Sequence, residues 1–178
     1  MLSISVRGFH PQIGEGTFVA PNATLVGDVV VGKQASIWFN AVIRGDVMPI
    51  RIGDQTNIQD GSIIHGTYKK CGTTIGNRVT VGHGVILHGC EVGDEVLVGM
   101  STTIMDLAQI PSRCIVGAGS LVTEEARFEE GWLILGRPAK AIRPLKPEEL
   151  AFLGKSADNY LHYTKWFEEG EKGDPHGN

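Results

Sequence analysis

Aliphatic residues recur at every sixth position along most of the chain. Stepping by six from Ile13 meets only aliphatic side chains as far as Ile43, and the series resumes after short slips at Ile52, Ile75 and Val92. The complete series is Ile13, Val19, Leu25, Val31, Ile37, Ile43, Ile52, Ile58, Ile64, Ile75, Val81, Leu87, Val92, Val98, Ile104, Ile110, Val116 and Val122. This period differs from the alternation of a half-buried strand and from the spacing of an amphipathic helix. The pattern therefore indicates a repeat architecture.

A second set of inward positions accompanies the aliphatic one. Four residues later the side chain is usually small or β-branched, as at Thr17, Ala23, Val29, Ala35, Ala41, Thr56, Ser62, Val79, Val85, Thr102, Ala108, Cys114 and Ser120. Glycine often follows the aliphatic residue directly, as at Gly53, Gly76 and Gly93, which suits a backbone that turns closely and repeatedly. Short strands at this spacing predict a β-helix, in which each hexad forms one flat side of a coil. A sandwich of alternating strands is the alternative, but it predicts a period of two.

The hexads, which cover roughly residues 13–125, resemble the hexapeptide-repeat family. The resemblance implies a mainly β fold, a left-handed parallel β-helix with the shape of a triangular prism. We expect this domain over 1–143, a C-terminal α-helix over 144–170 that packs on the β-helix or on a neighbouring subunit, and a flexible tail over 171–178 that contains a solvated His176. Pro147 suits the first turn of the helix, and the expected apolar stripe is Leu150, Leu153, Ala157, Leu161 and Trp166.

Composition narrows the classes of function. The 178 residues carry a formal net charge of −4, so the basic excess typical of a nucleic-acid binder is absent. The N-terminus shows no cationic region followed by an apolar run, and no segment approaches a membrane-spanning length. Cys71, Cys90 and Cys114 lack the spacing of a thiolate zinc site or a disulfide framework. We expect a cytoplasmic protein that binds neither nucleic acid nor membrane.

The phase of the repeat places two histidines in one outward column. Taking three hexads per coil puts Ile43, Ile64 and Leu87 on one side of the prism. His65 and His88 each follow one of these inward residues directly, so strand alternation points both outward, one coil apart at about 4.8 Å. Arg44 lies below them in the same column.

His83 falls on the adjacent side, stacked over Asp60 and next to Gln59. Because two outward sides of a prism diverge, a neighbouring chain is better placed to bring His83 to the column of His65 and His88. Closing that heterologous contact around a triangle gives a homotrimer with shared metal sites. Three neutral imidazoles with one open position are typical of catalytic Zn²⁺, and Fe²⁺ or Co²⁺ also accept imidazole. The alternative is that these histidines only occupy outward turn positions.

The motifs around the histidines resemble the γ-class carbonic anhydrases. They are "RGD", which begins at Arg44, "MPIRIGDQTNIQDGSIIH", which ends at His65, and "VGHGVILHG", which contains His83 and His88. The resemblance implies that His65 and His88 of one subunit and His83 of the next bind the metal, with Gln59 turned toward a metal-bound hydroxide. The implied enzyme is a lyase that reversibly hydrates CO2 to bicarbonate.

The resemblance also implies a charged network of Arg44, Asp46 and Asp60 that joins subunits and borders the bicarbonate site. Two acidic positions that family members use for proton transfer are missing here, since Val47 follows the "RGD" motif and the loop "GTYKKCGT" has no carboxylate. We therefore expect slow turnover, with buffer, Tyr160 or Tyr163 as a substitute proton acceptor. The alternatives are an acyltransferase that uses an acyl-CoA and a noncatalytic metal-binding assembly subunit.

Overall fold

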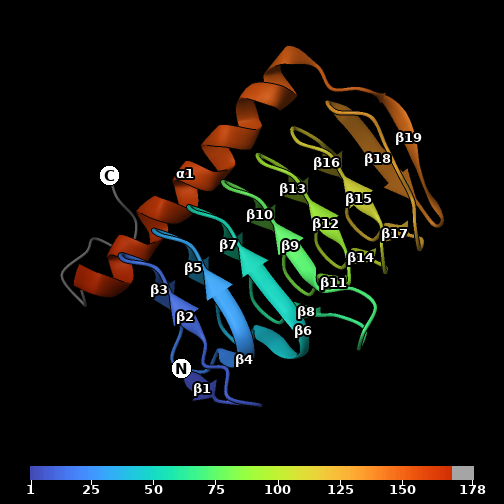
Figure 1. Cartoon of the computed structure of the whole chain (residues 1–178). Coiled ribbons are helices and arrows are strands. Elements are labelled where there is room, and N and C mark those ends of the chain that lie inside the picture. Colours follow the sequence, from blue (N-terminus) through green and yellow to red (C-terminus); the bar gives the residue numbers. More distant parts are fainter. Residues whose placement is uncertain (170–178) are drawn as a thin grey trace.

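The computed structural model describes residues 1–169, which form a three-sided left-handed β-helix and one long α-helix (Figure 1). The first face consists of β3 (Phe18–Val19), β5 (Ser36–Ile37), β7 (Asn57–Ile58), β10 (Thr80–Val81), β13 (Leu97–Val98), β16 (Ile115–Val116) and β18 (Trp132–Gly136), and β19 (Ala139–Pro144) pairs antiparallel with β18. All other ladders between named strands are parallel, so the expected fold is confirmed.

The second face consists of the first halves of β4 (Thr24–Val31) and β6 (Val42–Ile52), together with β8 (Ile63–His65), β11 (Ile86–His88), β14 (Thr103–Ile104), β17 (Leu121–Val122) and β1 (Leu2–Ile4). The third face consists of the second halves of β4 and β6, with β2 (Gln12–Ile13), β9 (Thr73–Ile75), β12 (Glu91–Val92) and β15 (Gln109–Ile110). Each face is therefore a ladder in which every rung comes from a different coil.

The observed strand register agrees with the phase of the hexads. Ile64 pairs with Ile43 on one side and with Leu87 on the other, and Ile58 pairs with Val81 on the first face. The predicted aliphatic positions from Leu25 to Val122 are all buried. Ile13 and Val19 are more exposed, because they lie in the first coil and no full coil covers the end of the prism.

The corners of the prism separate two roles of the backbone. The residues with positive φ are not the glycines directly after the aliphatic positions but residues two places later, such as Gln55 and Arg78 with φ of 56° and 55°. Gly76 is required for another reason. A Cβ there would lie 2.4 Å from Asp94 Oδ1 and 2.7 Å from the carbonyl carbon of Gly93 in the next coil. These glycines allow close approach of successive coils.

The helix α1 (Pro147–Glu169) begins at the predicted proline and lies along the first face of its own chain (Figure 1). Glu149 fixes its start, since its carboxylate accepts bonds from Arg143 at 2.7 Å and from the Lys146 backbone N–H at 2.8 Å. Leu153 and Ala157 are buried against the β-helix, as the stripe predicted.

Other parts of the helix prediction fare differently. Leu150 and Leu161 are only partly buried and Trp166 is 56% exposed in the single chain, so packing of Trp166 on a neighbouring subunit stays a prediction. The ring of Phe167 lies 5.3 Å from that of Phe18, although Phe167 is also half exposed. The predicted tail and His176 lie outside the described residues. In residues 1–169 no helix is long and apolar enough to span a membrane.

Candidate metal centre

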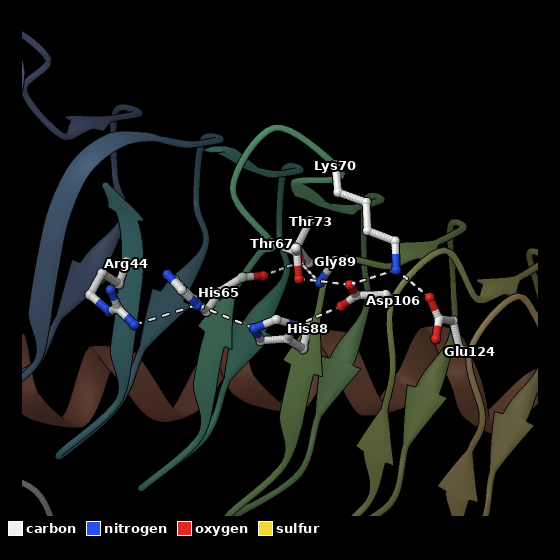
Figure 2. A network of polar contacts seen from close by, with 9 residues as sticks. All are labelled: Arg44, His65, Thr67, Lys70, Thr73, His88, Gly89, Asp106 and Glu124. Carbon is white, nitrogen blue, oxygen red and sulfur yellow. Dashed lines mark hydrogen bonds and ion pairs between the residues drawn. The ribbon is translucent and has the colours of Figure 1, made fainter. Parts of the chain in front are cut away.

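His65 and His88 occupy neighbouring rungs of the second face. They end β8 and β11 and are paired in register, which places their ring centroids 5.2 Å apart. His65 Nδ1 lies 3.2 Å from His88 Nε2, and Figure 2 shows the two rings in one row with Arg44. The column predicted from the hexads is therefore present in the structure.

Asp46 and Arg44 set the protonation of His65. Arg44 Nη1 donates to Asp46 Oδ2 at 2.5 Å, and His65 Nε2 lies 3.0 Å from Asp46 Oδ1. Burial lowers the pKa of His65, and the nearby Arg44 charge adds to this effect against the opposing Asp46. The ring is therefore neutral at neutral pH, and the carboxylate assigns its single proton to Nε2. His65 Nδ1 then carries no proton and can accept a hydrogen bond. Arg44 Nη2, which lies 3.4 Å away, is a suitable donor.

Asp46 is itself held ionised. Burial alone would raise the pKa of Asp46, but the hydrogen bonds from Arg44 and His65 outweigh burial and hold the pKa below its ordinary value. An ionised carboxylate only accepts hydrogen bonds. Asp46 therefore couples the Arg44 guanidinium to the orientation of the His65 ring.

Asp106 contacts His88, and the sequence interpretation did not include it among the site residues. Its Oδ1 lies 2.6 Å from His88 Nδ1, while its Oδ2 accepts from Thr67 Oγ1 at 2.6 Å. Lys70 Nζ lies 3.3 Å from the same Oδ2 and also pairs with Glu124 (Figure 2). The sequence signal for Asp106 is its place in the repeat. It comes two residues after the inward Ile104, which pairs with Leu87 of the preceding coil, next to His88.

His83 lies on a different part of the prism. It follows β10 on the first face, and its Nδ1 is 2.9 Å from Asp60 Oδ2, so the predicted stacking over Asp60 is observed. About half of the His83 side chain is exposed. Among residues 1–169, no group of three or more His, Cys, Asp or Glu side chains of one chain is arranged to hold a metal ion.

Gln59 and Tyr160 meet His83 at a cavity of about 530 Å³ between α1 and the first face. Gln59 is buried and its Nε2 donates to Asn57 Oδ1 at 3.1 Å. Burial, with Asp60 and Tyr163 nearby, raises the pKa of Tyr160 to about 12. Its phenol therefore keeps its proton at neutral pH and acts as a donor.

The donor set suits a divalent cation. His65 Nδ1 and His88 Nε2 face each other at 3.2 Å, and the far nitrogen of each ring lies against a carboxylate, Asp46 for His65 and Asp106 for His88. Each ring can therefore direct its nearer nitrogen at a cation placed beside both rings. Carboxylates on the far nitrogens are the usual partners of metal-ligating imidazoles.

Known proteins resemble this chain in sequence and fold. A family model described as bacterial transferase hexapeptide (six repeats) matches residues 10–45. Gamma carbonic anhydrase 2, mitochondrial, of Arabidopsis thaliana is 42% identical over 160 residues, which cover 87% of this chain and 58% of that protein. The chain therefore spans less than two thirds of that relative.

Two further matches cover more of the relative. A carbonic anhydrase of Geobacillus kaustophilus is 41% identical over 161 residues, which cover 90% of this chain and 88% of that protein. The crystal structure of a hexapeptide transferase family protein from Anaplasma phagocytophilum is 41% identical with a TM-score of 0.88, over 92% of this chain and 96% of that one.

Proposed function

This chain belongs to the γ-class carbonic anhydrase family, and from that premise we propose that it forms a homotrimer that reversibly hydrates CO2 to bicarbonate at a metal ion shared between subunits. The observation that carries the proposal is the 3.2 Å approach of His65 Nδ1 and His88 Nε2, with a carboxylate on the far nitrogen of each ring. His83 supplies the third imidazole from a neighbouring subunit, because it lies on another face of its own chain. The proposed metal is Zn²⁺, with Fe²⁺ or Co²⁺ as alternatives.

The bound metal supplies Lewis acidity and lowers the pKa of a water ligand to about 7. The protein groups hold and orient what surrounds it. Asp60, which accepts from His83 Nδ1, leaves Nε2 of that ring free to face the neighbouring subunit. Arg44 is fixed by Asp46 and presents the remaining guanidinium donors to a carboxylate such as bicarbonate.

Gln59 and Tyr160 are the proposed neutral donors of the site. Both line the cavity that reaches His83, and neither carries a charge at neutral pH. The Gln59 side chain is oriented by its bond to Asn57, so its amide can bind an oxygen of the substrate or of water. The high pKa of Tyr160 favours hydrogen bonding over proton transfer, and solvent buffer is left as the proposed proton acceptor.

An exposed apolar strip on the second face supports the trimer. Ile63 and Ile86 are paired across β8 and β11, two residues before His65 and His88, and are 44% and 38% exposed. Aliphatic side chains beside a polar site are favourable to bury against another subunit. A contact of this face with the His83 region of a second chain is heterologous, and three such contacts close a ring.

Stopped-flow CO2 hydration of metal-loaded, anaerobically prepared protein tests the activity. We expect hydration that disappears on chelation and returns with Zn²⁺, Co²⁺ or Fe²⁺. The similarity to the hexapeptide transferase family protein from Anaplasma phagocytophilum favours an acyltransferase as the second candidate. That enzyme would depend on an acyl-CoA and keep its activity after chelation. Stoichiometric metal without CO2 hydration would instead identify a noncatalytic assembly subunit.

A further inference from the structure

The His88 ring is held between a metal-facing nitrogen and the Asp106 carboxylate. Asp106 Oδ1 lies 2.6 Å from His88 Nδ1, on the side opposite His65. We propose that Asp106 is a positioning residue that keeps the His88 proton on Nδ1 and so leaves Nε2 free to bind the metal. This inference rests on the proposed function, but the state of the ring exists without metal and can be measured without it.

The direction of the bond follows from the chemistry of the carboxylate. An ionised carboxylate accepts hydrogen bonds and donates none, so a neutral His88 must place its proton on Nδ1. Asp106 is surrounded by donors, since Thr67 Oγ1 donates to its Oδ2 at 2.6 Å and the Lys70 ammonium lies 3.3 Å from the same oxygen. The carboxylate therefore acts as an acceptor toward His88 as well.

The two oxygens of Asp106 have different neighbours. Oδ1 lies 2.6 Å from His88 Nδ1, whereas Oδ2 accepts from Thr67 Oγ1 at 2.6 Å and lies 3.3 Å from Lys70 Nζ. The Cys71 thiol also lies close to this carboxylate. An ammonium group can only donate, so the group at the Oδ2 position has to accept. Glu124 holds Lys70 in place from the other side (Figure 2).

This asymmetry predicts an unusual effect of Asp106→Asn. The amide oxygen takes the Oδ2 position, because the amide nitrogen there would face the Lys70 ammonium. The NH2 group then points at His88 Nδ1 and donates to it, which moves the ring proton to Nε2. A protonated Nε2 cannot bind a metal ion, and we expect metal affinity to fall by about 10- to 100-fold.

Removing the ammonium should relieve that defect. In the double variant Asp106→Asn with Lys70→Met, the amide can turn over, because the Thr67 hydroxyl can accept as well as donate. Its oxygen then accepts from His88 Nδ1 and the metal-binding ring state returns. We expect the double variant to bind metal more tightly than Asp106→Asn alone, an outcome that a purely structural role of Asp106 does not predict.

NMR of 15N-histidine-labelled, metal-free protein at alkaline pH shows which nitrogen of the His88 ring carries the proton (the ring state). The Zn²⁺ affinity is measured by competition of the protein with a chromophoric chelator. We expect His88 to carry its proton on Nδ1 in the wild type and in the double variant, and on Nε2 in Asp106→Asn. Asp158→Asn is the matched control, since Asp158 pairs with Arg78 near α1 at 3.0 Å, and it should leave ring state and affinity unchanged.

An unchanged His88 ring state in Asp106→Asn overturns the positioning role, and so does a double variant that binds no better than the single one. Failure of the wild type to bind Zn²⁺ contradicts the proposed function instead. In that case the NMR measurement on metal-free protein still decides whether Asp106 sets the ring state.

Discussion

Ionisation of Asp106 contributes to the stability of the metal-free protein toward acid. Its folded-state pKa of about 2 lies below the ordinary value of 3.8, so ionised Asp106 stabilises the folded state. This stabilisation is fully present above the unfolded-state pKa near 4 and is lost as the pH falls from 4 to 2. The shift corresponds to about 2 kcal/mol.

The test compares the wild type with Asp106→Asn by chemical denaturation of metal-free protein between pH 4 and 6 and again near pH 2.5. Wild-type unfolding free energy should fall more steeply on acidification than that of the variant, because the amide does not titrate. Parallel curves for the two proteins would show that Asp106 is not held ionised by the fold.

Residue by residue, the sequence predicts the part of the site that depends only on register. His65, His88 and Arg44 share a column because strand alternation and the hexad phase fix outward directions, and His83 lies over Asp60 for the same reason. Contacts made by long side chains across coils are not fixed in this way. The Lys70 to Glu124 pair joins a loop to a turn that is 54 residues away.

Among the elements, the tight stacking of coils is set by glycines that face backbone. Gly76→Ala would place a methyl group 2.7 Å from the carbonyl carbon of Gly93, and the two coils must separate to make room. We expect a loss of about 1–3 kcal/mol in unfolding free energy. Gly61→Asn is the matched control at a corner with φ of 69°, where a Cβ meets no atom within 4 Å.

The corner can accept asparagine because Asn40 adopts φ of 58° at the equivalent corner of the preceding coil. Denaturation curves of both variants and of the wild type give the three unfolding free energies to be compared. A destabilised Gly61→Asn together with a neutral Gly76→Ala would reverse the roles assigned to these two positions.

The hexad period also shows how far pattern alone predicts the elements. It gives the strand positions and their pairing, because each inward aliphatic residue must lie in the core. The hexad period says little about α1, because α1 lies outside the repeat and exposes apolar as well as polar side chains. Ser156 is buried there and bonds to Thr80 at 3.0 Å, while Phe152 and Trp166 are exposed.

For the whole molecule, the absence of an acidic residue from the loop after His65 has a kinetic consequence. The loop carries Lys70 instead, and its ammonium is already paired with Asp106 and Glu124. We expect proton removal by buffer to limit CO2 hydration, since no loop carboxylate relays the proton. The hydration rate should rise with imidazole buffer concentration at fixed pH and ionic strength and then level off. A rate independent of buffer would require an internal proton acceptor.

Subunit arrangement is the feature that one chain predicts least directly, because it depends on two faces that meet only in the assembly. The most direct measurement is metal binding by mixed trimers of His65→Ala and His83→Ala. Each variant alone should lose metal, but the first still supplies His83 and the second still supplies His65 and His88. After subunit exchange, which is followed with differently labelled chains, zinc content should recover in part. Confirmed exchange without recovery of bound zinc would contradict a site shared between subunits.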